Sequence, residues 1–248
     1  MNGLCAKGQS KLKQSVNPSL SIILPVHNEK ESIERVLLEW IEEIKKHVYS
    51  YSFIICEDGS TDGTKELLHK LRKKYNLILE QKQYRRGYGQ AVIDGIETAT
   101  SDYILCIDSD GQCDPLDFKK FWEHRDIKDV VIGRRIFRAD PFQRKVFSRL
   151  FKTFFSLLFP THIKDPSAPF VLFKKQTVKA HLSYLIYLKE GFWWGFVGMC
   201  VKKNLSLHEI PITHRKRLVG NTKVYQLNHI ASIALRNILG LIQMRLSP

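Results

Sequence analysis

The sequence has no uninterrupted apolar run that approaches the roughly 20 residues a helix needs to cross a bilayer. Its opening stretch, MNGLCAKGQSKLKQS, is polar and lacks the apolar core of a secretory signal. From these two absences we expect a cytoplasmic protein with no spanning helix, so that contact with a membrane must be peripheral, on its cytoplasmic face.

Cysteine is also sparse, and its arrangement argues against two kinds of stabilised domain. The chain has five cysteines, an odd number, with no CxxC spacing. A disulfide framework needs cysteines in pairs, and common zinc sites need closely spaced ligands. Cys56 and Cys106 lie within apolar strand-like runs, where a thiol packs as a small apolar side chain. We therefore expect a reducing compartment and no structural zinc.

Acidic residues are outnumbered by basic ones. The chain has 39 Lys and Arg against 25 Asp and Glu, a net charge of +14, and no acid follows Glu209. A charge of this sign favours phosphates, nucleic acid or an acidic membrane surface as partners. No nucleic-acid-binding motif is present, so we expect no nucleic-acid partner.

Apolar runs alternate with helical patterns through the first half of the chain, which is typical of an α/β fold. At 248 residues and 44% hydrophobic, the chain is long enough for one such domain with a sizeable core. The predicted strands are Leu20–Val26, Ser52–Cys56, Leu77–Glu80, Tyr103–Ile107 and Val130–Gly133, and the predicted helices are Glu31–His47, Thr64–Tyr75 and Gln90–Ala99. This alternation implies right-handed crossovers and a mostly parallel, Rossmann-like sheet flanked by helices. Ligands of such sheets bind beyond the carboxyl ends of the strands.

The second half of the chain is first densely basic and then apolar. Residues 134–152 contain seven Arg or Lys and one acid, Asp140. The patterns predict a helix over Phe151–Phe159 and strands over Asp165–Phe173 and Leu205–Ile212. A final amphipathic helix places the following residues on one face: Leu227, Ile230, Ala234, Ile238, Leu241 and Ile242.

Two carboxylates follow the fourth predicted strand. Tyr103–Ile107 runs directly into Asp108-Ser109-Asp110-Gly111-Gln112. At a strand end, two carboxylates two positions apart and a Gln oxygen can converge on a hard divalent cation, which prefers oxygen ligands. A diphosphate then completes the coordination shell, and the metal neutralises charge on a leaving nucleotide. The alternative is an Asx-rich turn that leads into a helix starting at Asp114-Pro115.

Two further polar turns, Pro25–Glu29 and Glu57–Thr64, follow the first and second predicted strands. An acid at this edge can bind the hydrogen-bond donors of a base or a ribose. The alternative is local, with Asp62 or Thr61 capping the next helix and the glycines serving the turn. The residues are compatible with both interpretations.

Taken in order, these segments resemble glycosyltransferase family two, which has the GT-A fold, and within it the polyprenol-phosphate sugar synthases of the dolichol-phosphate mannosyltransferase type. Six segments between Ser19 and Tyr225 carry the resemblance: Ile22–Glu29, Glu57–Thr64, Gly87–Ala91, Asp108–Gln112, Val131–Arg135 and His208–Ile212. The resemblance implies a metal-dependent hexosyltransferase that uses Mg²⁺ or Mn²⁺.

The resemblance also implies roles by position. The metal ligands would be Asp108, Asp110 and Gln112. The nucleotide-sugar pocket would comprise Pro25, His27, Glu29, Glu57 and Asp58, together with Asp108 and Asp110. The acceptor phosphate would meet Arg135, Arg144, Ser148, Arg217 and Lys223, and the catalytic residues would be Asp110 and Arg135. His27, Glu57 and Tyr88 stand where relatives usually carry other residues, which leaves the base and the sugar open.

A phosphate acceptor suits a site rich in arginine. A hydroxyl acceptor needs a general base, whereas a phosphate monoester, with a second pKa near ~6, is already an anion. Arginines neutralise the charge of a phosphate acceptor and orient it through paired hydrogen bonds. Together with this argument, the resemblance implies a GDP-mannose or UDP-glucose type of donor, a polyprenyl or dolichyl phosphate as acceptor, and inversion at the anomeric carbon. The acid-free C-terminal helix would rest on an anionic membrane surface.

Two alternatives remain open: a transferase of the same fold that acts on a soluble glycan or protein hydroxyl, and a metal-dependent nucleotidyltransferase. The expected organisation is a polar segment over 1–18, a GT-A catalytic domain over 19–213, and a basic loop with an amphipathic helix over 214–248. Within the catalytic domain we expect a nucleotide-sugar and metal half, 19–133, and an acceptor half, 134–213. The sequence makes no prediction of oligomeric state.

Overall fold

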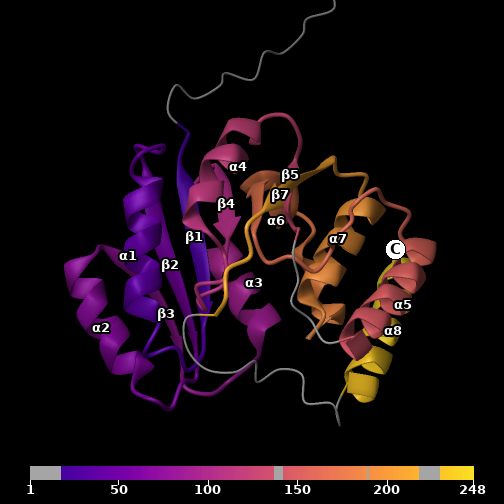
Figure 1. Ribbon diagram of the computed structural model, residues 1–248, viewed down its shortest axis with the longest axis horizontal. Helices are drawn as coiled ribbons and strands as arrows, with labels where there is room; N and C mark the ends of the chain where they lie inside the picture. The colour runs from indigo at the N-terminus through magenta and orange to yellow at the C-terminus, as the bar shows by residue number, and fades with distance from the viewer. Residues whose placement is uncertain (1–17, 137–141, 189, 218–229) are drawn as a thin grey trace, which may run out of the picture.

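The protein is described by a computed structural model over residues 18–136, 142–188, 190–217 and 230–248, with backbone alone for 142–147, 230 and 231. In these ranges seven strands form one sheet, and helices cover both of its faces (Figure 1). The strands are β1 Leu20–Val26, β2 Tyr51–Asp58, β3 Leu77–Lys82, β4 Tyr103–Cys106, β5 Val130–Arg135, β6 Val171–Lys174 and β7 Leu207–Ile212. The helices are α1 Ile33–Ile44, α2 Thr64–Lys74, α3 Tyr88–Thr98, η1 Pro115–Asp117, α4 Phe118–His124, α5 Phe142–Leu158, α6 Lys175–Lys179, η2 Leu182–Tyr187, α7 Phe192–Lys202 and α8 Ile230–Leu246.

The sheet is mostly parallel, which confirms the predicted fold class. Its strand order is β3-β2-β1-β4-β6-β5-β7. β1 pairs in parallel with β2 and β4, β2 with β3, and β5 with β7. Among the described strands only β6 runs antiparallel, between β4 and β5. The strand order reverses between β1 and β4, and a ligand site is expected at such a switch point.

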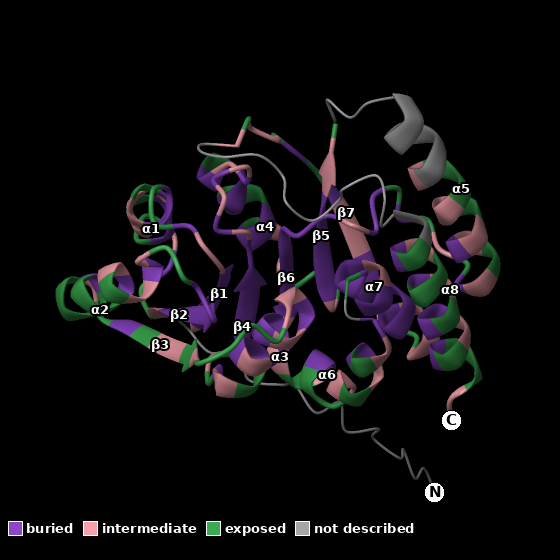
Figure 2. Ribbon diagram, turned by 90° about the horizontal axis from the view of Figure 1, so that it is seen from below, coloured by how far each residue is buried: buried purple, intermediate pink, exposed green. Residues whose placement is uncertain are grey.

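Side chains of the central strands alternate between two cores, as the pleat of a strand requires. On β1, Ile23 joins the core shared with α3, α7 and α8, whereas Ile22 and Leu24 join the core shared with α1, α2 and α4. Figure 2 shows α1 and α4 on one face of the sheet and α3, α6 and α7 on the other, with α5 and α8 outside α7. The alternation explains why the apolar runs of β1 and β4 form strands that are buried on both faces.

The predicted strand Asp165–Phe173 is wrong over most of its length, because β6 covers only Val171–Lys174. The residues before it form turns and irregular backbone. Pro166 and Pro169 have no backbone N–H to donate to a neighbouring strand, so this stretch is poorly suited to a ladder. The helix predicted over Phe151–Phe159 is present as α5, which begins earlier, at Phe142.

The C-terminal helix is present as α8, and the side that it buries is not the apolar face named from the sequence. The buried residues of α8 include Ile233, Asn237, Leu241 and Met244, and of the predicted face only Leu241 is among them. Leu227 and the side chain of Ile230 lie outside the described residues. Leucines on other sides of α8 are exposed. Because α8 is apolar on more than one side, its packing against α7 and η2, rather than its periodicity, selects the buried face.

Candidate active site

The loops at the carboxyl ends of β1, β2 and β4 are tied together by hydrogen bonds. These strands are parallel neighbours, so their loops emerge at the same edge of the sheet. Ser109 Oγ donates to the carbonyl oxygen of Pro25 at 2.8 Å. His27 Nδ1 lies 2.8 Å from the carbonyl oxygen of Asp58, a spacing that fits donation from a protonated Nδ1. The predicted nucleotide and metal segments therefore lie together in the fold.

Asp108 and Asp110 form a like-charged pair just after β4. The Tyr88 hydroxyl donates to Asp108 Oδ1 at 2.7 Å, and the Trp193 Nε1–H donates to the Tyr88 hydroxyl oxygen at 2.8 Å. Burial, and after it the negative charge of Asp110, raises the pKa of Asp108 to about 7. The site therefore contains a carboxyl group that tends to keep a proton near neutrality, a tendency that a cation beside it would reverse.

The Asp108–Asp110 pair suits a divalent cation that brings further ligands with it. In the described ranges, no group of three or more His, Cys, Asp or Glu side chains could hold a metal ion. A hard cation such as Mg²⁺ typically combines one or two carboxylates with waters and phosphate oxygens. Two carboxylates at one strand end meet that requirement. The Gln112 amide also faces the segment after β7, since its Nε2 lies 3.3 Å from His214 Nε2.

Glu57 and Asp58 end β2, and their carboxylates are used differently. Asp58 accepts hydrogen bonds from the backbone N–H groups of Arg86 and Gly87, at 2.7 and 2.8 Å, and so fixes the turn before α3. Glu57 Oε1 accepts from the backbone N–H of Ser60 at 2.5 Å. Its Oε2 is buried and has no hydrogen-bond partner among the described residues. Because such an unpaired oxygen is costly, Glu57 is fitted to accept a hydrogen bond from a ligand.

Glu29, just after β1, connects this edge to the segment that follows β7. Ser32 Oγ donates to Glu29 Oε2 at 2.6 Å, and Arg217 donates to Glu29 Oε1. Arg217 Nη1 also lies 3.7 Å from Asp110 Oδ2. Burial raises the pKa of Glu29, although the Ser32 hydrogen bond and the charge of Arg217 act in the opposite direction. Arg217 therefore bridges the loop after β1 and the loop after β4.

Arg135, at the end of β5, is held by a bidentate ion pair. Its Nε and Nη2 donate to Asp165 Oδ2 and Oδ1 at 2.7 and 2.8 Å, and Nη2 also donates to Ser167 Oγ at 2.7 Å. The Arg135 and Asp165 side chains are only 11% and 8% exposed. Burial alone would lower the pKa of Arg135, but the hydrogen bonds and charge of Asp165 outweigh it and raise the pKa. Arg135 thus has a fixed orientation and a permanent charge.

Asp165 is a residue of this site that sequence reasoning missed, because it was assigned to a strand. Glu209 fixes it in turn, since Glu209 Oε1 accepts from the backbone N–H groups of Lys164 and Asp165 at 2.7 and 2.8 Å. A signal was available in the sequence. Between residues 141 and 189, Asp165 is the single acid among many basic residues. A buried arginine needs a carboxylate partner, so Asp165 was the residue of this stretch to consider as that partner.

Two of the five predicted acceptor-phosphate residues lie close enough to the carboxylate pair to act on it. The charges of Arg135 and Arg217 both lower the pKa of Asp108, against the larger effect of burial. Ser148 lies half-buried on α5. The side chain of Arg144 and the whole of Lys223 lie outside the described residues.

The mostly parallel α/β sheet, with the acidic pair and two arginines at its carboxyl edge, fits the GT-A type expected from the sequence. Residues 21–182, well over half of the chain, match Glycosyl transferase family 2. The chain belongs to this family.

Two similar proteins are named for the transfer of a sugar to dolichyl phosphate. The chain is 29% identical over 216 residues to the dolichyl-phosphate β-glucosyltransferase of Dictyostelium discoideum, covering 79% of this chain and 66% of that protein. It is 29% identical over 214 residues to the dolichol-phosphate mannosyltransferase of Pyrococcus furiosus, covering 83% of this chain and 59% of that protein. The chain therefore spans less than two thirds of the length of these relatives.

Among solved structures, the chain resembles glucosyl-3-phosphoglycerate synthase from Mycobacterium tuberculosis. One such structure, a complex with Mn²⁺, UDP and phosphoglyceric acid, has a TM-score of 0.66 at 16% identity and covers 93% of this chain and 80% of that one. At this level of identity the likeness concerns the fold, and it agrees with the GT-A type predicted from the sequence.

Proposed function

We propose that this protein is an inverting, metal-dependent glycosyltransferase that moves a hexose from a nucleotide-diphosphate sugar, of the GDP-mannose or UDP-glucose type, to a polyprenyl or dolichyl phosphate. The observation that carries the proposal is the Asp108–Asp110 pair at the switch point, flanked by Arg135 and Arg217. The activities of the two lipid-phosphate relatives support the acceptor class. The Mn²⁺ and UDP-glucose bound to a structural neighbour support the donor class and the metal.

The described residues suggest how the donor would be held. Asp108 and Asp110 would bind Mg²⁺ or Mn²⁺, which when present neutralises charge on the leaving diphosphate. Glu57 would use its unpaired Oε2 to accept a hydrogen bond from the base or ribose. Glu29, His27 and Pro25 line the same edge, and Asp58 keeps the next turn in place. Donor recognition thus rests on one unpaired carboxylate oxygen and one cation site.

The acceptor needs no general base in this mechanism. A phosphate monoester is an anion at neutral pH and attacks the anomeric carbon with an oxygen that carries no proton to remove. Arg135 would attract and orient it, because its guanidinium is fixed by Asp165 beside Asp108. One phosphate-oxygen–carbon bond forms as the carbon–oxygen bond to the nucleotide diphosphate breaks, so the configuration inverts. Arg144, Ser148, Arg217 and Lys223 complete the proposed acceptor set, and Arg217 also lies beside Asp110 of the proposed donor site.

We also propose a peripheral contact with an anionic membrane, made by α5 and α8. None of the helices in the described ranges has the length and hydropathy of a membrane span. Five leucines on the two helices are nevertheless exposed: Leu150, Leu157, Leu235, Leu239 and Leu246. Neither helix sequence contains an acid. Exposed leucines with basic neighbours fit the interface of an acidic bilayer.

The membrane contact predicts weaker sedimentation with vesicles after polar substitution. Leu235→Ser with Leu239→Ser removes two apolar side chains from the outer side of α8, and we expect binding to vesicles that contain phosphatidylserine to fall about tenfold or more. Ile78→Ser, on the exposed surface of β3, is the control. Unchanged binding of the leucine variant would contradict the proposed surface.

The transfer reaction itself is tested with the full chain, Mg²⁺ or Mn²⁺, a polyprenyl phosphate in detergent and a panel of labelled nucleotide-sugars. We expect metal-dependent entry of label into the organic phase, and its loss in Asp110→Asn. Donor hydrolysis without lipid labelling would overturn the lipid acceptor and favour a soluble one. Transfer of a nucleoside monophosphate in place of the sugar would favour a nucleotidyltransferase.

The proposed function also assigns a role to each part of the chain. Residues 19–133 would form the nucleotide-sugar and metal half, 134–213 the acceptor half, and 214–248 the basic loop and the terminal helix. A cytoplasmic protein on the cytoplasmic face of a membrane would meet its nucleotide-sugar directly.

A further inference from the structure

Five residues that follow β7, Thr213–Arg217, lie along the loop that contains Asp108 and Asp110; we name them the clamp segment. The backbone N–H of Thr213 donates to Asp117 Oδ2 at 2.6 Å. His214 forms an antiparallel bridge with Cys113, and the backbone N–H of Arg215 donates to the carbonyl oxygen of Gln112 at 2.9 Å. The clamp segment is therefore fixed to Gln112, one of the predicted metal ligands, and to the residues that follow it.

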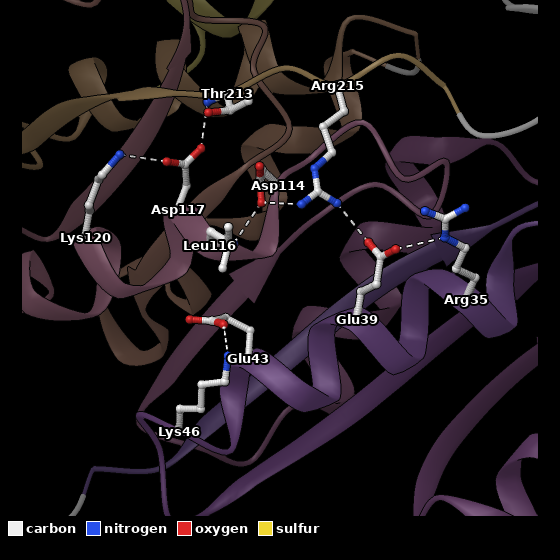
Figure 3. Close-up of polar contacts among 10 residues, drawn as sticks. All are labelled: Arg35, Glu39, Glu43, Lys46, Asp114, Leu116, Asp117, Lys120, Thr213 and Arg215. Carbon is white, nitrogen blue, oxygen red and sulfur yellow. Dashed lines mark hydrogen bonds and ion pairs between the residues drawn. The ribbon is translucent and has the colours of Figure 1, made fainter.

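The side chain of Arg215 ties the clamp segment to two separate elements. Its Nη2 lies 2.6 Å from Asp114 Oδ1, in the loop before η1, and its Nη1 lies 2.9 Å from Glu39 Oε2, on α1 (Figure 3). Glu39 also accepts from Arg35 Nε at 2.9 Å through its other oxygen. The Arg215 side chain is one third exposed. A guanidinium can bridge two carboxylates in this way because its donors form a rigid planar fork.

Arg217, two residues further along, is the part of the clamp segment that reaches the proposed donor site. It contacts Glu29 and lies 3.7 Å from Asp110. Two residues of extended chain span only about 7 Å. The position at which Arg215 is anchored therefore limits where the guanidinium of Arg217 can lie. Arg215 itself has no contact with Asp108, Asp110 or Glu29 among the described interactions.

We propose that Arg215 is a positioning residue for donor binding, which anchors the clamp segment to α1 and to the metal loop so that Arg217 meets the diphosphate of the nucleotide-sugar. The inference rests on the proposed function and adds to it a residue that makes no contact with the substrate. Arg217 is held beside the acidic pair before the donor arrives. A diphosphate that binds there would contact Arg217 without a rearrangement of the clamp segment, so donor binding would cost little conformational entropy.

The inference is tested by calorimetric titration of the full chain with GDP and with UDP, each in the presence of Mn²⁺. Four variants are compared with the wild type: Arg215→Ala, Arg215→Lys, Arg217→Ala and the double variant. We expect Arg215→Ala to weaken nucleotide binding roughly tenfold, because two charge-assisted hydrogen bonds that hold the clamp segment are lost. Arg215→Lys keeps the charge but loses the fork, so we expect it to restore binding only in part.

The double variant separates positioning from a direct or general electrostatic effect. If Arg215 acts through Arg217, its removal costs nothing further once Arg217 is gone, so the double variant binds as Arg217→Ala does. Arg35→Ala is the matched control, since it removes a positive charge from the same carboxylate, Glu39, but leaves the clamp segment untouched. We expect that control to bind nucleotide as the wild type does.

The outcomes distinguish this inference from the proposed function. A wild-type protein that binds neither nucleotide with Mn²⁺ overturns both. Three results would each overturn the role of Arg215 and leave the proposed function standing. The first is wild-type nucleotide affinity in Arg215→Ala. The others are a loss of affinity on removing Arg215 that is the same with and without Arg217, and a loss in Arg35→Ala as large as that in Arg215→Ala. Melting temperatures of all variants are measured alongside, and a loss of binding by a folded Arg215→Ala supports positioning.

Discussion

Replacing Asp108 by Asn is expected to stabilise the metal-free protein above neutral pH while removing a ligand of the proposed cation. Burial and the charge of Asp110 raise the pKa of Asp108 from 3.8 to about 7. Between those values the folded state holds a proton that the unfolded state has released. The free energy of unfolding therefore falls as the pH rises through this window.

The magnitude follows from the size of the shift. About three pKa units correspond to about 4 kcal/mol. Asp108 is partly exposed at the strand end, and solvent screening reduces the electrostatic effect. We therefore expect Asp108→Asn to raise the free energy of unfolding above neutral pH by about 2 kcal/mol. Asn keeps an oxygen that can accept the hydrogen bond from Tyr88 and carries no charge. For a chain of this size, the variant should melt about 4–8 °C higher than the wild type at pH 8, and the difference should shrink towards pH 4.

The assay is thermal denaturation in EDTA at a series of pH values, with Asp102→Asn as a control of opposite sign. Hydrogen bonds from the backbone N–H and the hydroxyl of Ser19 lower the pKa of Asp102. Its contribution to stability is present above the unfolded-state pKa and is lost as the pH falls, so this variant should be destabilised at neutral pH. An Asp108→Asn variant that is no more stable than the wild type at pH 8 would refute the reasoning.

Two further predictions concern stability. Asp165→Ala leaves the Arg135 guanidinium in a largely buried position without its bidentate partner, so urea denaturation should show a loss of about 3 kcal/mol; a loss under about 1 kcal/mol would mean that solvent replaces the partner. Gly59→Ala should cost about 2 kcal/mol or more in the same assay, because at φ +69° a Cβ would lie 2.4 Å from the backbone nitrogen of Arg85. Gly87→Ala also has a positive φ but meets no atom within 4 Å, so it should cost less, and equal losses would contradict the steric explanation.

Local patterns in the sequence were enough to find the first half of the fold. The predicted strand Leu20–Val26 agrees with β1 residue for residue, and the helix predicted over Thr64–Tyr75 agrees with α2 to within one residue. Both rest on short-range periodicity, which the sequence displays directly. The placement of Asp108 and Asp110 at a switch point followed from the same pattern, because parallel strands bring their carboxyl ends to one edge.

The partners of the charged residues, in contrast, depended on the path of the chain. The chain has 39 Lys and Arg, and nothing local indicates which of them faces a given acid. Arg135 pairs with Asp165 because β6 enters the sheet antiparallel between β4 and β5, which brings the turn before β6 to the end of β5. Arg217 reaches Glu29 across most of the chain because β7 ends beside the loop after β4.

The same division applies to the outer helices. The sequence by itself determined that α8 is a helix without acids and rich in leucine. Which of its sides is buried was decided by contact with α7 and η2, and the exposed leucines appear only once that contact is known. Secondary structure and strand-end chemistry arise from neighbours within a few residues. Ion pairs and buried helix faces arise from contacts between distant segments, which only the tertiary structure brings together.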